Sequence, residues 1–231
     1  MPLSVFENRV NRPCGPFEDA VFGSRMLKQY AGLLAKCGNS EILDLGPVCG
    51  SNIAFFLGHA AKLHVYDILA RFPSERLRQE TMEKILATFL YEKNSLDGIH
   101  IWDLPDHLDN KALSLMVQKL GSLLKPRGLL VMIACNLSGH QSFSQYFKIG
   151  DNYTVSLQRA MARRLPYFYR TNRDIERAMK PFEQLSSYIC TNGMREFLFR
   201  GPRPVKPPPQ AVASFTRQSR VNEEQHDSAV T

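Results

Sequence analysis

The sequence has no apolar run near the roughly 20 residues that a bilayer-spanning helix needs. Its first twenty residues mix acidic and basic side chains and contain no apolar segment typical of a signal peptide. Its five cysteines are widely separated and include no C-x-x-C pair, so neither a zinc site nor a redox dithiol is indicated. These absences predict a soluble cytoplasmic protein that holds no metal and does not enter a membrane.

The dinucleotide fingerprint G-x-G-x-x-G is also absent, which disfavours an NAD-dependent oxidoreductase. What is present is length and apolar content: 231 residues, 44% of them hydrophobic, are enough for one large core. We expect an irregular arm over residues 1–16, one domain over 17–200, and a disordered proline-rich and polar tail over 201–231.

The net charge of +7 is concentrated in one segment, because residues 159–200 hold nine Lys and Arg against four Asp and Glu. The basic side chains between positions 159 and 180 are Arg159, Arg163, Arg164, Arg170, Arg173, Arg177 and Lys180. A solvated helix face is the simplest interpretation. An acidic substrate is an alternative, and nucleic acid is an unfavoured one because no nucleic-acid motif accompanies the arginines.

Residues 41–56 read as a buried strand, a tight turn and the start of a helix. An apolar run ends at Gly46, a second glycine follows at Gly50, and Ser51 or Asn52 can cap the helix. Glycines between a strand end and a helix start let a ligand approach the backbone, and the helix N-terminus favours a carboxylate or a phosphate. The stretch therefore predicts a ligand-binding turn.

A second strand, over residues 62–67, ends in Asp67, which lies 23 positions after Asp44. In nucleotide-binding βαβ units an acid near this spacing accepts hydrogen bonds from ribose hydroxyls. A carboxylate that caps the next helix is the alternative interpretation of Asp67.

Several motifs, in this order, resemble class I S-adenosylmethionine-dependent methyltransferases. The run from Asp44 to Gly50 is similar to the first motif of that family, D-x-G-x-G-x-G, with Val48 in place of the middle glycine. Residues 97–107 are similar to its fourth strand, and residues 124–134 to its L-x-P-G-G turn and fifth strand, with Arg127 in place of the first glycine. Asn192-Gly193 between two strand-like runs predicts a hairpin, which matches the antiparallel sixth and seventh strands of the family.

The resemblance implies an α/β fold: a Rossmann-like, mostly parallel sheet with helices on both faces and a C-terminal antiparallel hairpin. Helices are expected over residues 17–36, 74–91, 110–124 and 173–180, and an extra strand over 153–157. Only residues 92–96 are available for the family's third strand, so that strand is short or missing.

The resemblance also implies a methyltransferase that binds S-adenosylmethionine and methylates a small molecule. The residues that would bind this donor are Asp44, Gly46, Gly50, Asn52, Asp67, Ile68 and Trp102. Asp103 and His107 are the candidates for orienting or deprotonating the acceptor. Trp102, the only tryptophan, has a core position as its alternative role, and helix capping would also explain Asp103.

A protein that kept this fold and lost turnover is the second hypothesis. It is motivated by Val48, Arg127 and the shortened sheet region. The acceptor and the oligomeric state cannot be predicted from the sequence.

Overall fold

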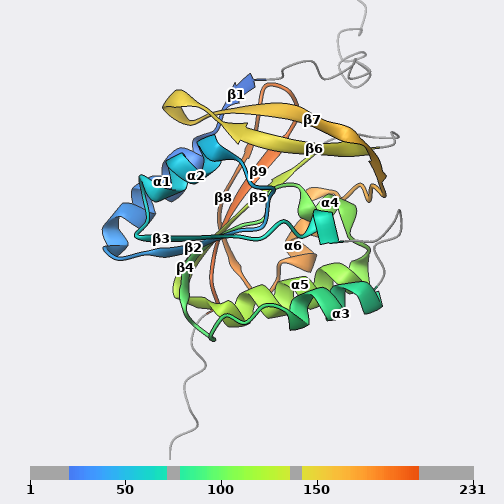
Figure 1. The fold of residues 1–231 in the computed structure, drawn as a ribbon, viewed down its shortest axis with the longest axis horizontal. Coiled ribbons are helices and arrows are strands. Elements are labelled where there is room, and N and C mark those ends of the chain that lie inside the picture. Colours follow the sequence, from blue (N-terminus) through green and yellow to red (C-terminus); the bar gives the residue numbers. More distant parts are fainter. Residues whose placement is uncertain (1–20, 72–78, 136–141, 203–231) are drawn as a thin grey trace, which may run out of the picture.

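The computed structural model describes residues 21–71, 79–135 and 142–202 (Figure 1). The arm expected over residues 1–16 and nearly all of the tail expected over 201–231 lie outside these ranges, so both domain boundaries stay predictions. Within the described ranges, none of the helices combines the length and the apolar character that a transmembrane span requires.

A six-stranded sheet with the order β3-β2-β4-β5-β9-β8 forms the centre of the fold (Figure 1). Its first four strands are parallel: β3 (Lys62–Val65), β2 (Glu41–Asp44), β4 (Leu96–His100) and β5 (Leu124–Ala134). Its last two are antiparallel: β9 (Arg195–Arg200), which pairs with β5, and β8 (Glu183–Ile189) at the edge. The Rossmann-like fold and the C-terminal hairpin are thereby confirmed.

The hairpin turn forms where Asn192-Gly193 predicts it. Gly193 has φ +82°, a left-handed conformation that glycine adopts at little cost, and its N–H donates to the Cys190 carbonyl at 2.9 Å. At the other end of the sheet β3 is the edge strand, so the described part of the chain contains no strand in the place of the family's third.

Helices cover both faces of this sheet (Figure 1). On one face α1 (Arg25–Leu34) and α2 (Gly50–Leu57) enclose an aromatic-rich core. On the other, α3 (Gln79–Ala87) and α5 (Asn110–Leu123) enclose an aliphatic one. Apolar stripes at helical spacing account for both layers, because each helix turns one buried side toward the sheet.

A second sheet, with the order β1-β7-β6, lies beyond the end of α2 and was not predicted (Figure 1). It consists of β1 (Val21–Gly23), β6 (Ser142–Ile149) and β7 (Thr154–Leu165), all antiparallel. The expected strand over 153–157 is the first part of β7. Strand β1 was missed because it pairs with a strand about 130 positions away, and local patterns carry no signal of such pairing. Strands β6 and β7 form a local hairpin, with Ile149 opposite Val155, so β6 had a local signal that was not used.

Several element boundaries also differ from the predictions. The first helix begins at Arg25 because Ser24 caps it, its hydroxyl accepting from the Leu27 N–H at 2.9 Å. The cap of α2 is Cys49 and not Ser51 or Asn52. The helix expected at 173–180 is α6 (Asn172–Ala178), and Thr171 caps it through a capping box. Part of the helix expected at 74–91 lies outside the described residues.

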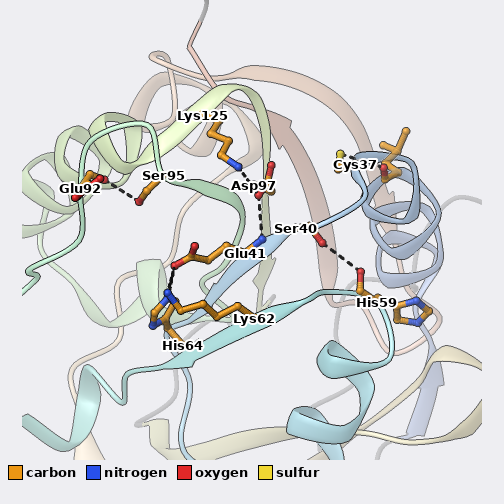
Figure 2. A network of polar contacts seen from close by, with 11 residues as sticks. Cys37, Ser40, Glu41, His59, Lys62, His64, Glu92, Ser95, Asp97 and Lys125 are labelled. Carbon is orange, nitrogen blue, oxygen red and sulfur yellow. Dashed lines mark hydrogen bonds and ion pairs between the residues drawn. The ribbon is translucent and has the colours of Figure 1, made fainter.

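The amino ends of the parallel strands are joined by a polar cluster (Figure 2). The Glu41 carboxylate accepts hydrogen bonds from Lys62 Nζ, at 2.9 Å, and from the His64 ring. The Asp97 carboxylate accepts from the Glu41 N–H at 2.9 Å and from Lys125 Nζ at 2.7 Å. These contacts join the strands at their amino ends, whereas the candidate site lies at their carboxyl ends.

Candidate functional site

A small hollow lies at the carboxyl ends of β2, β3 and β4, which is where open α/β sheets bind their ligands. Gly46 follows β2, Asp67 follows β3, and Trp102 and Asp103 follow β4, and all four line the hollow. Phe147 on β6 forms a further wall. The structure thus brings four of the predicted site residues together and adds one that was not predicted.

Asp44 and Trp102 are joined inside this site. The Trp102 Nε1–H donates to Asp44 Oδ1 at 2.7 Å, and the Gly46 N–H donates to the same oxygen at 3.1 Å. Burial raises the pKa of the Asp44 carboxyl to about 7, although both hydrogen bonds favour its ionised form. The first acid of the motif therefore already has its partners within the protein.

The indole of Trp102 fills the space above Gly46. A Cβ at position 46 would lie 2.5 Å from Trp102 Nε1, so only glycine permits this arrangement. On its other side the indole stacks on the Phe147 ring, with 5.3 Å between centroids and 4° between planes. Trp102 is 4% exposed and has φ +46°, a strained conformation for a bulky residue.

The hollow that remains has a volume of about 20 Å³. This is room for roughly one water molecule, whereas pockets for ligands of nucleotide size measure some 300–1,000 Å³. S-adenosylmethionine therefore does not fit the site as it stands, because the protein's own indole takes up the space beside the glycine turn.

Asp67 caps a short turn, as the alternative interpretation expected, and its role toward ribose stays a prediction. Its Oδ1 accepts from the Ala70 N–H at 2.9 Å and so caps a short 3₁₀ turn, η2 (Leu69–Arg71), while the residue still lines the hollow. Ile68 beside it is fully buried and packs into the aliphatic core.

Gly50 and Asn52 do not line the hollow. Gly50 is the exposed first residue of α2. The buried Asn52 amide binds the backbone of β6, donating to the Phe147 carbonyl and accepting from the Ile149 N–H, both at 2.8 Å. Asn52 thereby holds β6, and with it Phe147, against α2.

Asp103 and His107 form a buried pair at either end of α4 (Leu104–His107). His107 Nε2 lies 3.3 Å from Asp103 Oδ2, and its Nδ1 donates to the Pro166 carbonyl at 3.0 Å. Burial lowers the pKa of His107, but the charge and hydrogen bond of Asp103 outweigh this, and the pKa lies above its usual value. Since His107 is 2% exposed, it can position Asp103 but does not reach an acceptor itself.

Asp106, on the same short helix, is a buried acid that the sequence offers beside Asp103 and His107 as a group that could orient or deprotonate an acceptor. Its Oδ2 accepts from the Cys135 N–H, just past β5, at 2.7 Å, and burial raises its pKa to about 7. Phe147 was not predicted. The alternating apolar positions Phe143, Phe147 and Ile149 were a signal for a half-buried strand there.

No protein-family model and no curated protein sequence matches this chain. Among solved structures, it is similar to an S-adenosylmethionine-dependent methyltransferase from Clostridium acetobutylicum, with 14% identity over 76% of this chain and 92% of that one and a TM-score of 0.49. It is similar to the N-methyltransferase NodS from Bradyrhizobium japonicum, with 16% identity over 77% and 94% and a TM-score of 0.47.

A third similar structure is the Burkholderia thailandensis 1,6-didemethyltoxoflavin-N1-methyltransferase with bound 1,6-didemethyltoxoflavin and S-adenosylhomocysteine. Identity is 14% over 77% of this chain and 79% of that one, with a TM-score of 0.47. Values this low say nothing about activity, and the fold assignment rests on strand order and direction. By those criteria, the chain has the Rossmann-like fold that the resemblance to class I methyltransferases implied.

Proposed function

We propose that this chain is an S-adenosylmethionine-dependent methyltransferase that acts on a small molecule. The observation that carries the proposal is that Gly46, Asp67, Trp102 and Asp103 meet in one hollow at the carboxyl edge of the parallel sheet. These residues lie at the ends of three separate strands, and the sequence predicted each of them as a site residue.

The donor supplies an activated methyl group, so the protein has mainly to hold two molecules in line and exclude water. Asp67 suits the ribose hydroxyls, since a carboxylate accepts from both. The turn at Gly46 suits the methionine part only when the Trp102 indole has moved away. The strained backbone of Trp102 favours such a movement, because leaving φ +46° relieves a cost of roughly 1–2 kcal/mol.

The second candidate is a protein of this fold that does not transfer methyl groups. It is favoured by one specific observation: the space that a donor needs is filled by Trp102, whose Nε1–H is already paired with Asp44. Asp103 and His107 are also almost completely buried, so neither candidate base is open to solvent.

Calorimetric titration with S-adenosylhomocysteine tests the proposal, with Asp67→Ala as the site variant and Asp109→Ala as its match. Asp109 also caps a helix, its Oδ1 accepting from the Ala112 N–H at 2.8 Å, but it does not line the hollow. We expect the wild type and Asp109→Ala to bind equally well and Asp67→Ala to bind at least tenfold more weakly.

Equal affinity of all three proteins would remove Asp67 from the donor site. The absence of binding to the wild type at millimolar concentrations would overturn the proposed function. Binding without methyl transfer to any acceptor from a panel of small amines, alcohols and acids would favour the second candidate.

A further inference from the structure

Two adjoining open hollows are lined by residues of α5, α6 and the segment 168–171. Their volumes are about 720 and 730 Å³, and they share Tyr169, Asp174 and Arg177 in their walls. We call the two together the arginine hollow. Its walls contain Arg170, Arg173, Arg177 and Arg195, and Asp174 is the only acid among the described residues that line it.

Two of these arginines are buried without an ion-pair partner. Arg170, 5% exposed, donates to the carbonyls of Pro105 and Leu108 at 2.5 and 2.6 Å. Arg195, 6% exposed, donates to Asn172 Oδ1 at 2.8 Å and to the Arg170 carbonyl at 2.7 Å. Among the described residues, neither guanidinium forms an ion pair with a carboxylate. Asp106, Asp174 and Asp109 attract Arg170 only from beyond ion-pair distance. A buried charge whose hydrogen bonds go to neutral acceptors is costly unless a counter-charge completes it.

Arg195 also keeps an unused donor. Its Nε is buried and has no hydrogen-bond partner in the part of the chain that the structure describes, although the residue lines the arginine hollow. The Asp106 carboxyl, on α4, is close enough to interact electrostatically with Arg195. Burial of Asp106, however, disfavours its ionised form. The nearest parts of the protein therefore do not complete the hydrogen bonding of this guanidinium.

Asp174 does not neutralise the arginine hollow. Its Oδ2 is engaged in the capping box of α6, accepting from the Thr171 N–H at 3.0 Å and the Thr171 hydroxyl at 2.6 Å. Its Oδ1 lies 3.5 Å from Arg177 Nη1, and no carboxylate of the described residues forms an ion pair with Arg173 at the rim. Three of the four arginines thus remain without a carboxylate of their own.

Two aromatic rings line the same space. Phe168 and Tyr169 are 36% and 49% exposed, which is unusual for side chains of their size. Arg170 lies 5.7 Å from the Phe168 ring centre and Arg195 lies 5.8 Å from that of Tyr169. Each ring thus places an apolar face next to a cationic group.

We propose that the arginine hollow binds a small molecule that carries an oxyanion, either a carboxylate or a phosphate, next to a planar apolar group. The oxyanion would lie against Arg195, Arg173 and Arg177, since guanidinium groups match both anions with paired hydrogen bonds. The planar group would lie on Tyr169 and Phe168. This inference does not depend on methyl transfer, because none of these residues lines the donor hollow.

The test is calorimetric titration of the full chain with phenyl phosphate, benzoate and inorganic phosphate at 50 mM salt. We expect phenyl phosphate or benzoate to bind at least fivefold more tightly than inorganic phosphate, because only the first two have a planar apolar part. The stronger of the two identifies the anion as phosphate or carboxylate.

Charge removal then locates the site. Arg173→Gln/Arg177→Gln should weaken binding at least tenfold, and Tyr169→Ala should abolish the preference over inorganic phosphate. Lys93→Gln is the matched control, an exposed cation in the turn before β4 and away from the hollow, and it should leave the affinity unchanged. All four positions are exposed, so the variants should fold.

Three results would overturn the inference: no saturable binding of any probe, equal weakening by Lys93→Gln, or tight binding of an oligonucleotide whose affinity falls steeply with salt while the small anions do not bind. The last result would mean a nucleic-acid surface, because counterion release from several phosphates gives such a slope.

Discussion

The closed hollow and the arginine hollow differ in how far the protein's own side chains fill the space and pair the polar groups that line it. In the closed one, the Trp102 indole fills the space, its N–H is paired with Asp44, and Phe147 stacks on it. In the arginine hollow, space is open, the Arg195 Nε–H finds no hydrogen-bond partner among the described residues, and the two buried guanidiniums donate hydrogen bonds to neutral oxygens. The first can take a ligand only by giving up existing contacts, whereas the second gains contacts when a ligand enters.

The largest effect is expected from Arg170→Met, which removes the guanidinium that joins the wall of the arginine hollow to α4. The carbonyls of Pro105 and Leu108 would lose their charged donor, and we expect a loss of roughly 5 kcal/mol in unfolding free energy. Urea denaturation measures it, with exposed Arg173→Gln as a control that should change stability by less than about 0.5 kcal/mol. A loss below about 1 kcal/mol would show that Arg170 is not needed for this wall.

Asp44→Asn tests how far the closed hollow disfavours charge. Because the folded-state pKa of Asp44 is about 7 and its unfolded pKa about 3.9, its stabilising contribution is complete below about pH 4 and is lost as pH rises through 7. Asparagine keeps the acceptor for Trp102 and Gly46 but cannot ionise. We expect the variant to equal the wild type at pH 4 and to exceed it by a few kcal/mol at pH 8.

The measurement for Asp44→Asn is the difference in unfolding free energy between the two proteins at each pH. Taking the difference cancels the contributions of two other buried groups, which both proteins share. Asp106 has a similarly raised pKa. Burial lowers the pKa of His100 to about 3, so His100 changes stability in the opposite direction between about pH 3 and 6.5. A difference that does not change with pH would mean that the Asp44 carboxylate tolerates its charge.

Phe147→Leu should make the closed hollow easier to open. Losing the ring stacked on Trp102 should cost about 1.5 kcal/mol of stability and raise the affinity for S-adenosylhomocysteine severalfold, because less contact is given up when the indole leaves. Binding of phenyl phosphate in the arginine hollow should not change. Weaker binding of S-adenosylhomocysteine would instead mean that the Phe147 ring contacts the bound molecule and does not only hold Trp102 in place.

The smallest effect is expected from Arg127→Gly, which concerns the opposite edge of the sheet. Arg127 has φ +68°, so glycine should relieve strain and stabilise the protein by about 1 kcal/mol without changing ligand binding. Thermal unfolding measures the gain. Any change in S-adenosylhomocysteine affinity would connect this turn to the site, contrary to its position.

The sequence predicted the parts that depend on local pattern. The apolar run before Gly46, the strand before Asp67 and the Asn192-Gly193 turn are each readable within a few residues. The meeting of Gly46, Asp67, Trp102 and Asp103 was predictable because the carboxyl ends of neighbouring parallel strands share one edge.

What was missed depends on contacts between distant segments. The pairing of β1 with β7 and the stacking of Phe147 on Trp102 each join segments whose proximity no local periodicity encodes. The arginine-rich segment reads as a solvated face by composition, yet Arg170 is buried because carbonyls some 60 positions earlier accept its hydrogen bonds. The burial of His107 likewise follows from the later segment around Pro166.

The central claim is that Trp102 occupies the space a donor would need, and the emission of this single tryptophan reports on it directly. Titrating the wild-type chain with S-adenosylhomocysteine, while following fluorescence and heat together, requires no substitution. We predict a saturable shift of the emission to longer wavelength, with the same dissociation constant as the heat of binding, because the indole leaves a buried stack. Saturable heat with unchanged emission would contradict the claim, since the donor would then bind without displacing Trp102.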